Sequence, residues 1–144
     1  MGVNLYNQEG YLDPTAYEAL TNIEKEQIEM KDKKKIVFIC SPFAGDVDGN
    51  TMRAKRYGRF AVMEKVIPII PHLMYPQFLE DNDPEERQLG IEMGLVLLGK
   101  CNELWVFGKY ISSGMALEIK KAKKWKMPIR YFETDCRENG GVSR

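Results

Sequence analysis

The chain has 144 residues, and its 21 Lys+Arg balance its 21 Asp+Glu, so its formal net charge is zero. This length fits a single domain, and a hydrophobic content of 44% can supply a core, which excludes a disordered chain. Zero net charge argues against a nucleic-acid polymer as the main partner, because domains that bind its backbone usually carry a basic excess.

The sequence pattern also bears on location. Apolar runs such as Ile67–Ile70 are far too short to span a bilayer, and the N-terminus does not place an apolar segment after a basic one. The three cysteines, Cys40, Cys101 and Cys136, are odd in number and lack the spacing of metal ligands. We therefore expect a cytoplasmic protein with reduced thiols, no metal, no cofactor and no membrane partner.

Residues 1–34 are expected to form an extension that carries one helix. Asp13 followed by Pro14 is a typical helix start, because Asp caps a helix N-terminus and Pro fits the first helical position. The apolar spacing that follows predicts a moderately amphipathic helix that ends near Lys31.

Four short apolar segments are predicted as strands. They are Ile36–Cys40, Ile67–Ile70, Glu103–Phe107 and Ile129–Phe132. The first is rich in β-branched residues, as buried parallel strands are, and Pro68 in the second favours an edge position. The polar tail at 133–144 is expected to fray.

The first two connections between strands contain turn-forming residues. Glycines and a proline predict an irregular loop over 41–50, after which Asn50 or Thr51 is expected to cap a helix. The stretch at 71–83 is also expected to be irregular.

The second half of the chain carries two more helical patterns. Asp83 and Pro84 start a helix that runs to about Gly99. Its end is apolar nearly all round, which predicts burial against both the sheet and a second subunit. The last helix is predicted over Met115–Trp125.

Strands that alternate with helices predict right-handed crossovers and a parallel sheet. The expected fold of residues 35–132 is therefore α/β, a Rossmann- or flavodoxin-like three-layer sandwich with four to five parallel strands and helices on both faces. Ligands of such sheets bind beyond the carboxyl ends of the strands. The loops at 41–50, 71–83 and 108–114 are therefore the expected site.

Glu118 interrupts the apolar arc of the last predicted helix. At about 100° per residue it falls on the same side as Met115 and Ala122, whereas three lysines lie on the opposite side. A carboxylate held against a sheet must be paired, hydrogen-bonded or partly protonated. Glu118 is therefore a candidate functional carboxylate. The alternative is a glutamate at the edge of the arc that reaches solvent or pairs with a lysine.

The loop after the first strand, SPFAGDVDGN, is a second candidate. Its backbone N–H groups and the helix N-terminus that follows suit a phosphate or a sugar hydroxyl. Ser41 lies at the strand end, where its hydroxyl can touch a ligand, and Asp46 and Asn50 follow it. Arg53, in the first turn of the helix, can meet an anionic group. The alternative is a plain connecting loop.

The other two loops hold further candidates. His72 is the single histidine, and it is either a site residue or a hydrogen-bonded structural histidine without the partners of a metal site. Tyr75 can stack on a base, pack inside the protein or contact a second copy. At least one of Ser112 and Ser113 is expected to be the N-cap of the last helix.

Three segments of the chain resemble a known family. They are SPF at Ser41, Pro42 and Phe43 with a later Asn, the run NDPEERxLGIxMGLxLLxKCxELWVFG within 81–108, and SxGMxxEIxxA on the last helix. They span residues 35–132 and resemble an uncharacterised bacterial and phage family of the nucleoside 2-deoxyribosyltransferase-like superfamily. The middle run and the SGMALEI segment are the most specific.

The resemblance implies a chemical role for Glu118. In the characterised enzymes, a glutamate on the helix after the third strand attacks the anomeric carbon and displaces the nucleobase. The G-M-x-x-E context, which begins at Gly114, places that nucleophile at Glu118. The family also has an aspartate about two turns earlier, where this chain has Ser112. For a second family aspartate the candidate substitutes are Asp83, Glu86 and Glu92.

We therefore predict an enzyme that cleaves the N-glycosidic bond of a nucleoside or nucleotide, by hydrolysis or deoxyribosyl transfer, with Glu118 as nucleophile. The predicted substrate-binding residues are Ser41, Pro42, Phe43, Asp46, Asn50, Arg53, His72, Tyr75, Ser112, Ser113 and Gly114. One alternative is a nucleotide-binding module without turnover, acting as a sensor or sequestering protein. Another is an interaction protein that uses the apolar middle helix. That helix and the small size of the chain also predict a homodimer or higher assembly.

Overall fold

The computed structural model describes residues 21–24 and 34–139, and it divides the chain into two units, Met1–Lys33 and Lys34–Arg144. In the first unit residues 21–24 are helical, inside the helix predicted from Asp13 to Lys31. The rest of that prediction lies outside the described residues. No helix in the described ranges has the length and apolar character that crossing a membrane requires.

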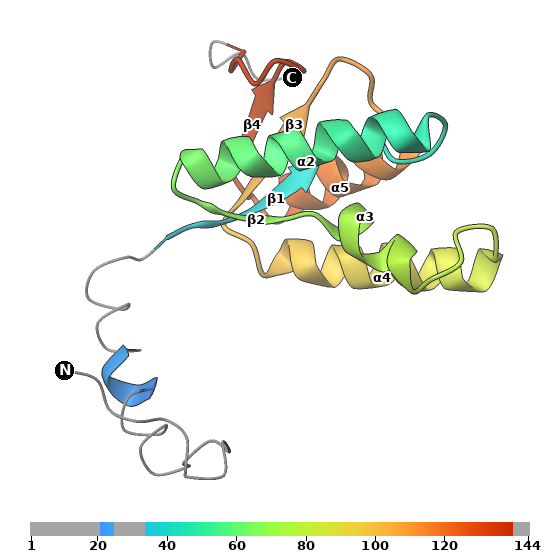
Figure 1. Cartoon of the computed structure of the whole chain (residues 1–144), viewed down its shortest axis with the longest axis horizontal. Helices are drawn as coiled ribbons and strands as arrows, with labels where there is room; N and C mark the ends of the chain where they lie inside the picture. The colour runs from blue at the N-terminus through green and yellow to red at the C-terminus, as the bar shows by residue number, and fades with distance from the viewer. Residues whose placement is uncertain (1–20, 25–33, 140–144) are drawn as a thin grey trace, which may run out of the picture. The chain divides into compact units, whose positions relative to one another are not determined.

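The second unit is built on a four-stranded sheet (Figure 1). Its strands are β1 (Ile36–Cys40), β2 (Ile67–Ile69), β3 (Glu103–Phe107) and β4 (Ile129–Phe132). They lie in the order β2-β1-β3-β4, and each neighbouring pair is parallel. The four predicted strands are confirmed. β2 lies at the edge of the sheet and pairs with a strand on one side only. The missing N–H of Pro68 is therefore tolerated better here than in a central strand.

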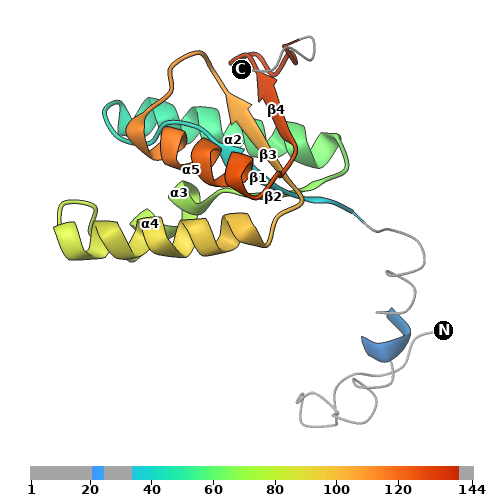
Figure 2. The same ribbon diagram turned by 180° about the vertical axis from the view of Figure 1, so that it is seen from behind.

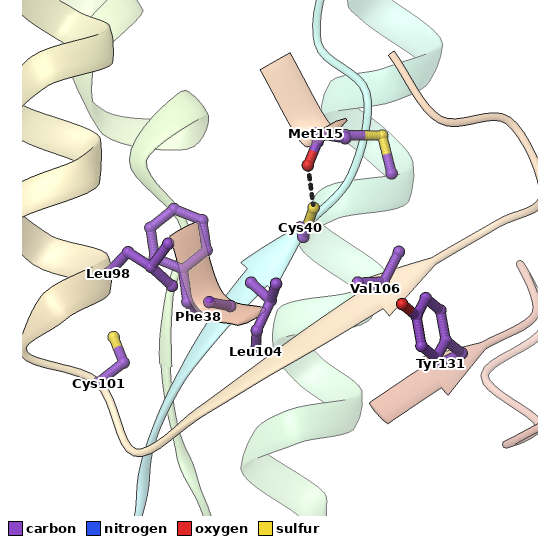
Figure 3. Packing of buried hydrophobic residues seen from close by; sticks show 9 residues of the cluster. Phe38, Cys40, Leu98, Cys101, Leu104, Val106, Met115 and Tyr131 are labelled. Carbon is purple, nitrogen blue, oxygen red and sulfur yellow. Dashed lines mark hydrogen bonds between the residues drawn. The ribbon is translucent and has the colours of Figure 1, made fainter. Parts of the chain in front are cut away.

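Helices cover both faces of this sheet (Figures 1 and 2). α2 (Val47–Met63) packs on one face, in a cluster that contains Val37, Ile39, Tyr57, Ala61, Trp105, Phe107 and Phe132. α4 (Pro84–Gly99) and α5 (Ser113–Lys124) pack on the other. Their cluster contains Phe38, Cys40, Leu98, Leu104, Val106, Met115 and Ala122 (Figure 3). Successive strand residues alternate between the two faces, and the predicted three-layer α/β sandwich is confirmed.

The predicted start of α2 is wrong. The helix begins at Val47, and Asp46 caps it by accepting a hydrogen bond from the Gly49 N–H at 3.2 Å. A Cβ at Gly49 would overlap the Asp46 carboxylate, so the glycine makes room for the cap instead of breaking the helix. Asn50 consequently lies inside the helix.

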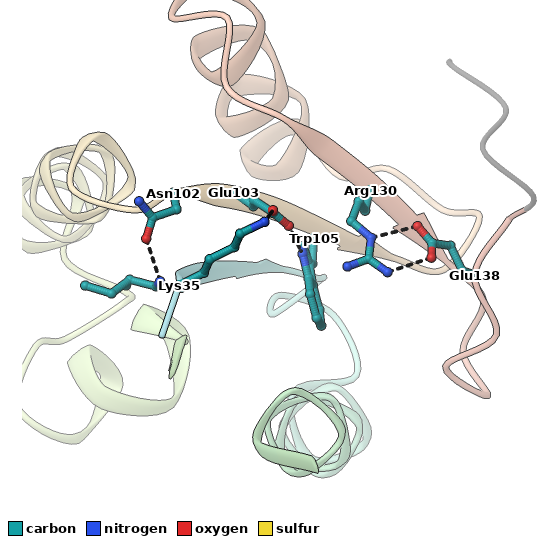
Figure 4. A network of polar contacts seen from close by, with 7 residues as sticks. Lys35, Asn102, Glu103, Trp105, Arg130 and Glu138 are labelled. Atoms are coloured by element: carbon teal, nitrogen blue, oxygen red, sulfur yellow. Dashed lines mark hydrogen bonds and ion pairs between the residues drawn. The ribbon is translucent and has the colours of Figure 1, made fainter. Parts of the chain in front are cut away.

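Two other segments are more ordered than predicted. Residues 71–83 include α3 (Pro71–Met74) and a 3-10 helix, η1 (Tyr75–Gln77), and Pro71 occupies the first position of α3, where no N–H is needed. The tail does not fray at once after β4. Glu138 forms an isolated bridge with Phe132, and its carboxylate pairs with Arg130 at 2.6 Å (Figure 4). Residues 140–144 lie outside the described part.

α4 starts as predicted, but it is not buried on both sides within this chain. Asp83 caps it by accepting a hydrogen bond from the Glu85 N–H at 3.0 Å. Only Gly94 and Leu98 of this helix are buried, and Val96 is 61% exposed. One side of α4 packs on the sheet, and its outer side exposes the apolar side chains of Leu89 and Val96.

A polar network occupies the amino ends of the strands (Figure 4). Glu103, at the start of β3, is only 7% exposed. Its carboxylate accepts hydrogen bonds from Lys35 Nζ at 2.8 Å and Trp105 Nε1 at 2.9 Å. Burial raises the pKa of Glu103, but these hydrogen bonds outweigh it and hold that pKa below its usual value. The charge at this edge is thus satisfied internally.

Candidate active site

A cavity of about 220 Å³ lies at the carboxyl ends of the strands. Its walls come from the loop after β1, from α3 and η1, from α4 and from the start of α5. The predicted site residues that line it are Ser41, Phe43, His72, Tyr75, Ser112, Ser113, Gly114 and Glu118. Crossovers of parallel strands bring these distant segments to one edge of the sheet.

α5 places Glu118 beside this cavity. Ser112 caps the helix, as predicted, by accepting a hydrogen bond from the Met115 N–H at 3.2 Å. Met115 and Ala122, on the same side of α5 as Glu118, are buried against the sheet. Glu118 itself is half-buried and lines the cavity.

The carboxyl group of Glu118 is poorly solvated and contacts the thiol of Cys40. Burial raises the pKa of Glu118 to about 7, and the hydrogen bond with Cys40 opposes this rise. Burial and the nearby carboxylate raise the pKa of Cys40 well above its usual value, so the thiol stays protonated and can donate. Its Sγ also lies 3.9 Å from the carbonyl oxygen of Met115 (Figure 3). Near pH 7 Glu118 therefore has protonated and ionised forms of similar free energy.

Ser41 and His72 form a second polar pair in the cavity. Ser41 Oγ lies 3.1 Å from His72 Nε2, and Ser41 is 6% exposed. Burial lowers the pKa of His72 to about 4, so its imidazole is neutral at pH 7. No group of three His, Cys, Asp or Glu side chains within residues 21–24 and 34–139 is arranged to hold a metal.

Four predicted site residues, Pro42, Asp46, Asn50 and Arg53, line another cavity, of about 420 Å³, beside α2. Asn50 is buried, and its Nδ2 donates to the carbonyl oxygens of Phe43 at 3.0 Å and Ala44 at 3.2 Å. Arg53 Nη2 lies 2.8 Å from Asn50 Oδ1 and 3.4 Å from Asp46 Oδ2. These three polar side chains hold the loop after β1 and lie outside the lining of the Glu118 cavity.

The α4 wall of the cavity was not predicted. Gly90 and Gly94 lie one turn apart in this wall, and a Cβ at Gly94 would meet nothing within 4 Å. The spacing of two glycines at i and i+4 in a helix is the sequence signal that could have found this wall. Arg87 of α4 also lines the cavity. Cys40 was likewise missed as the partner of Glu118, because nothing in a sequence distinguishes it from an ordinary buried cysteine.

The fold is of a known type. The chain resembles the structure of a 2-deoxyribosyltransferase from the psychrotolerant bacterium Bacillus psychrosaccharolyticus, described as a biocatalyst for the synthesis of nucleosides. The TM-score is 0.59 at 14% identity, over 76% of this chain and 77% of the other. This likeness confirms the predicted 2-deoxyribosyltransferase-like fold. A 2-desoxiribosyltransferase from Leishmania mexicana has a TM-score of 0.49 at 16% identity, over 69% of this chain and 64% of the other.

The family is also defined. Residues 35–132 match the model of a domain of unknown function, DUF7768, and the chain belongs to that family. No curated protein matches the chain. At 14% identity, the structural likeness concerns the fold alone.

Proposed function

We propose that this protein cleaves the N-glycosidic bond between the sugar and the base of a nucleoside or nucleotide, with Glu118 as the nucleophile. The observation that carries the proposal is the desolvated carboxyl group of Glu118, which lines a cavity at the carboxyl edge of the sheet. The fold shared with a 2-deoxyribosyltransferase supports the choice of substrate class.

The proposed reaction has two steps. First, a carboxylate oxygen of Glu118 forms a bond to C1′ as the bond from C1′ to the base nitrogen breaks, and the base leaves with that electron pair and takes up a proton. The sugar is then held on Glu118 as an ester. In the second step, water or another base attacks C1′, and the electron pair of the ester C–O bond returns to the carboxylate.

The surroundings of Glu118 suit the first step. Positive charge develops on the sugar as the base departs, and a carboxylate stabilises that charge more strongly where water is scarce. The Cys40 thiol can donate to the carboxylate and so favours its ionised form. Only this form can attack, so the reaction draws on the ionised fraction of Glu118.

The leaving base needs a proton from another group. The imidazole of His72 is neutral at pH 7, because burial lowers its pKa to about 4, so it does not serve as this acid. Asp81 and Glu86 line the same cavity and are the acidic candidates. Ser112 occupies the place where the resembling enzymes have an aspartate, and its oxygen caps α5.

The test is a chromatographic assay of a panel of nucleosides and nucleotides with the wild-type protein and with Glu118→Gln. We expect free base from at least one panel member with the wild type and a loss of about 10³-fold or more in the variant. Mass spectrometry of the acid-quenched wild-type protein should show the mass of the sugar added to the chain.

A matched variant, Glu64→Gln, removes one exposed carboxylate just after α2, outside the cavity lining. It should retain wild-type activity. Full activity in Glu118→Gln would show that Glu118 is not the nucleophile.

One observation favours a second candidate function, a nucleotide-binding module without turnover. Ser112 lacks the acidic group implied by the resemblance, and without a general acid the departure of the base loses about 10²–10⁴-fold in rate. Such a module would be stabilised against heat by an intact nucleotide and would release no base over hours. Base release with the wild-type protein excludes it.

A further inference from the structure

On the basis of the proposed function, we propose that Ser41 and His72 act together as the general base of the second step. They would direct water, rather than a second base, to the sugar bound on Glu118, and the protein would therefore be a hydrolase. Neither residue has a role in the first step described above.

The pair is positioned for this role by two strand ends. Ser41 directly follows β1, and His72 lies in α3, shortly after β2. β1 and β2 are parallel neighbours, so both residues emerge at the same edge of the sheet. Ser41 Oγ and His72 Nε2 are 3.1 Å apart, and both residues line the cavity that Glu118 lines.

Burial makes the pair a base rather than an acid. The neutral imidazole of His72 has one nitrogen without a proton, and with that nitrogen as Nε2 it accepts the hydroxyl proton of Ser41. The hydroxyl oxygen of Ser41 is then free to accept a proton from a water molecule in the cavity. A serine oxygen held in this way is more basic than an isolated hydroxyl.

The proposed step consumes one water molecule and returns Glu118, Ser41 and His72 to their starting forms. The water oxygen forms a bond to C1′ while the ester bond from C1′ to Glu118 breaks, and its electron pair returns to the carboxylate. One water proton passes to Ser41 Oγ as the original hydroxyl proton passes to His72 Nε2. The imidazolium then loses this proton to solvent, which restores the neutral pair.

The low basicity of His72 is compatible with this step. The carbon under attack carries much of the positive charge of an oxocarbenium ion, so a weak base is enough to assist water. Carboxylates, whose usual pKa values are near 4, assist water in the same way in retaining glycosidases.

The test separates the two steps by rapid quenching. The wild type, Ser41→Ala and His72→Gln are mixed with the four 2′-deoxynucleosides and their 5′-monophosphates. Base released in the first turnover, steady-state sugar release and the mass of the protein are then measured. We expect the release of the first base to fall much less than steady-state hydrolysis in both variants. Steady-state hydrolysis should fall by about 10²–10⁴-fold, and sugar-bound protein should accumulate.

Two further measurements distinguish proton transfer from a structural role. A free nucleobase added to the variants should discharge the bound sugar by transfer, because a base nitrogen can attack with its own lone pair. Imidazole should partly restore hydrolysis to a His72→Gly variant, and Ser41→Ala tests the pair separately if the histidine variants fail to fold.

An equal loss of both steps in Ser41→Ala would assign the pair to binding or folding, and unchanged hydrolysis would make it a bystander. Either result overturns this inference while the role of Glu118 stands. If the wild type forms neither free base nor sugar-bound protein, the proposed function fails and the inference fails with it.

Discussion

The thiol of Cys40, at the end of β1, is hydrogen-bonded to the carboxyl group of Glu118 on α5. Burial raises the pKa of both acids. The hydrogen bond between them acts in opposite directions, because it lowers the pKa of Glu118 and raises the pKa of Cys40. It stabilises the ionised form of Glu118 and the protonated form of Cys40. A strand end thus opposes the effect of burial on the ionisation of a residue 78 positions later on a helix.

Replacing Cys40 should therefore change the pH dependence of the proposed reaction. Cys40→Val removes the donor at similar volume, so the pKa of Glu118 should rise above about 7. The acid limb of kcat/KM, which reports the free enzyme, should move to higher pH. Cys40→Ser keeps a donor and should leave the limb near its wild-type position. A limb unmoved in Cys40→Val would show that the thiol does not influence the nucleophile.

Glu118 should make folding less favourable as pH rises. Between pH 4.5 and 7 the carboxyl group is ionised in the unfolded chain but protonated in the folded one, so the free energy of unfolding falls by up to about 3 kcal/mol. Glu118→Gln lacks this dependence. Urea titrations should show the variant gaining stability relative to the wild type from pH 4.5 to 7 and no further change above that window.

His72 should have the opposite effect. Between pH 6.5 and 4 the unfolded chain binds a proton at this residue and the folded chain does not, so acidification costs up to about 3 kcal/mol. His72→Gln should therefore gain stability relative to the wild type as pH falls through this window. The two dependences nearly cancel in the wild type between pH 4.5 and 6.5, and the single variants should reveal them. Parallel wild-type and variant curves would contradict the buried, neutral histidine.

Replacing Gly94 with a larger residue should leave folding intact but interfere with substrate binding. A Cβ there would meet nothing within 4 Å, and replacing glycine within a helix contributes about 0.5–1 kcal/mol of stability. Gly94→Leu should fold, melt no lower than the wild type and raise KM at least about tenfold, because its side chain enters the cavity. Gly99→Ala, near Trp125 and outside the cavity lining, is the matched control and should leave KM unchanged.

The predicted self-association through α4 remains to be tested. Its outer side exposes Leu89 and Val96, which lie two turns apart on one face of the helix, and exposed apolar side chains favour association with another surface. We expect sedimentation velocity to find a dimer or larger assembly, and Val96→Glu to shift it toward the monomer. A wild-type monomer at all accessible concentrations would refute the prediction.

The pattern of the sequence was sufficient for most of the sheet. Short, mainly apolar segments placed all four strands, and β1 and β3 are buried almost throughout, as expected for the central strands of a parallel sheet. Asp83 and Pro84 placed the start of α4 because their side chains act locally. The start of α2 was missed for the opposite reason. Glycine usually interrupts helices, but the absence of a Cβ at Gly49 makes room for the side chain of Asp46 that caps α2.

The candidate site was predictable only in part. Helical spacing singled out Glu118, because the sequence alone shows a carboxylate at a position that falls among apolar residues on one side of a helix. The sequence did not show that Asn50 and Arg53 lie outside the cavity that Glu118 lines. Both follow the same strand as Ser41, but α2 directs them to the other side of the loop.

By itself the amino-acid order determined the parallel α/β layers and marked one inward carboxylate. Burial and helical periodicity both appear in the sequence as patterns of apolar residues. Only the tertiary structure decided the partners of that carboxylate and of Ser41. Cys40 and Glu118, and Ser41 and His72, are brought together by strand pairing and by helix packing on the sheet. Such contacts depend on distances across the fold, and the local pattern does not encode them.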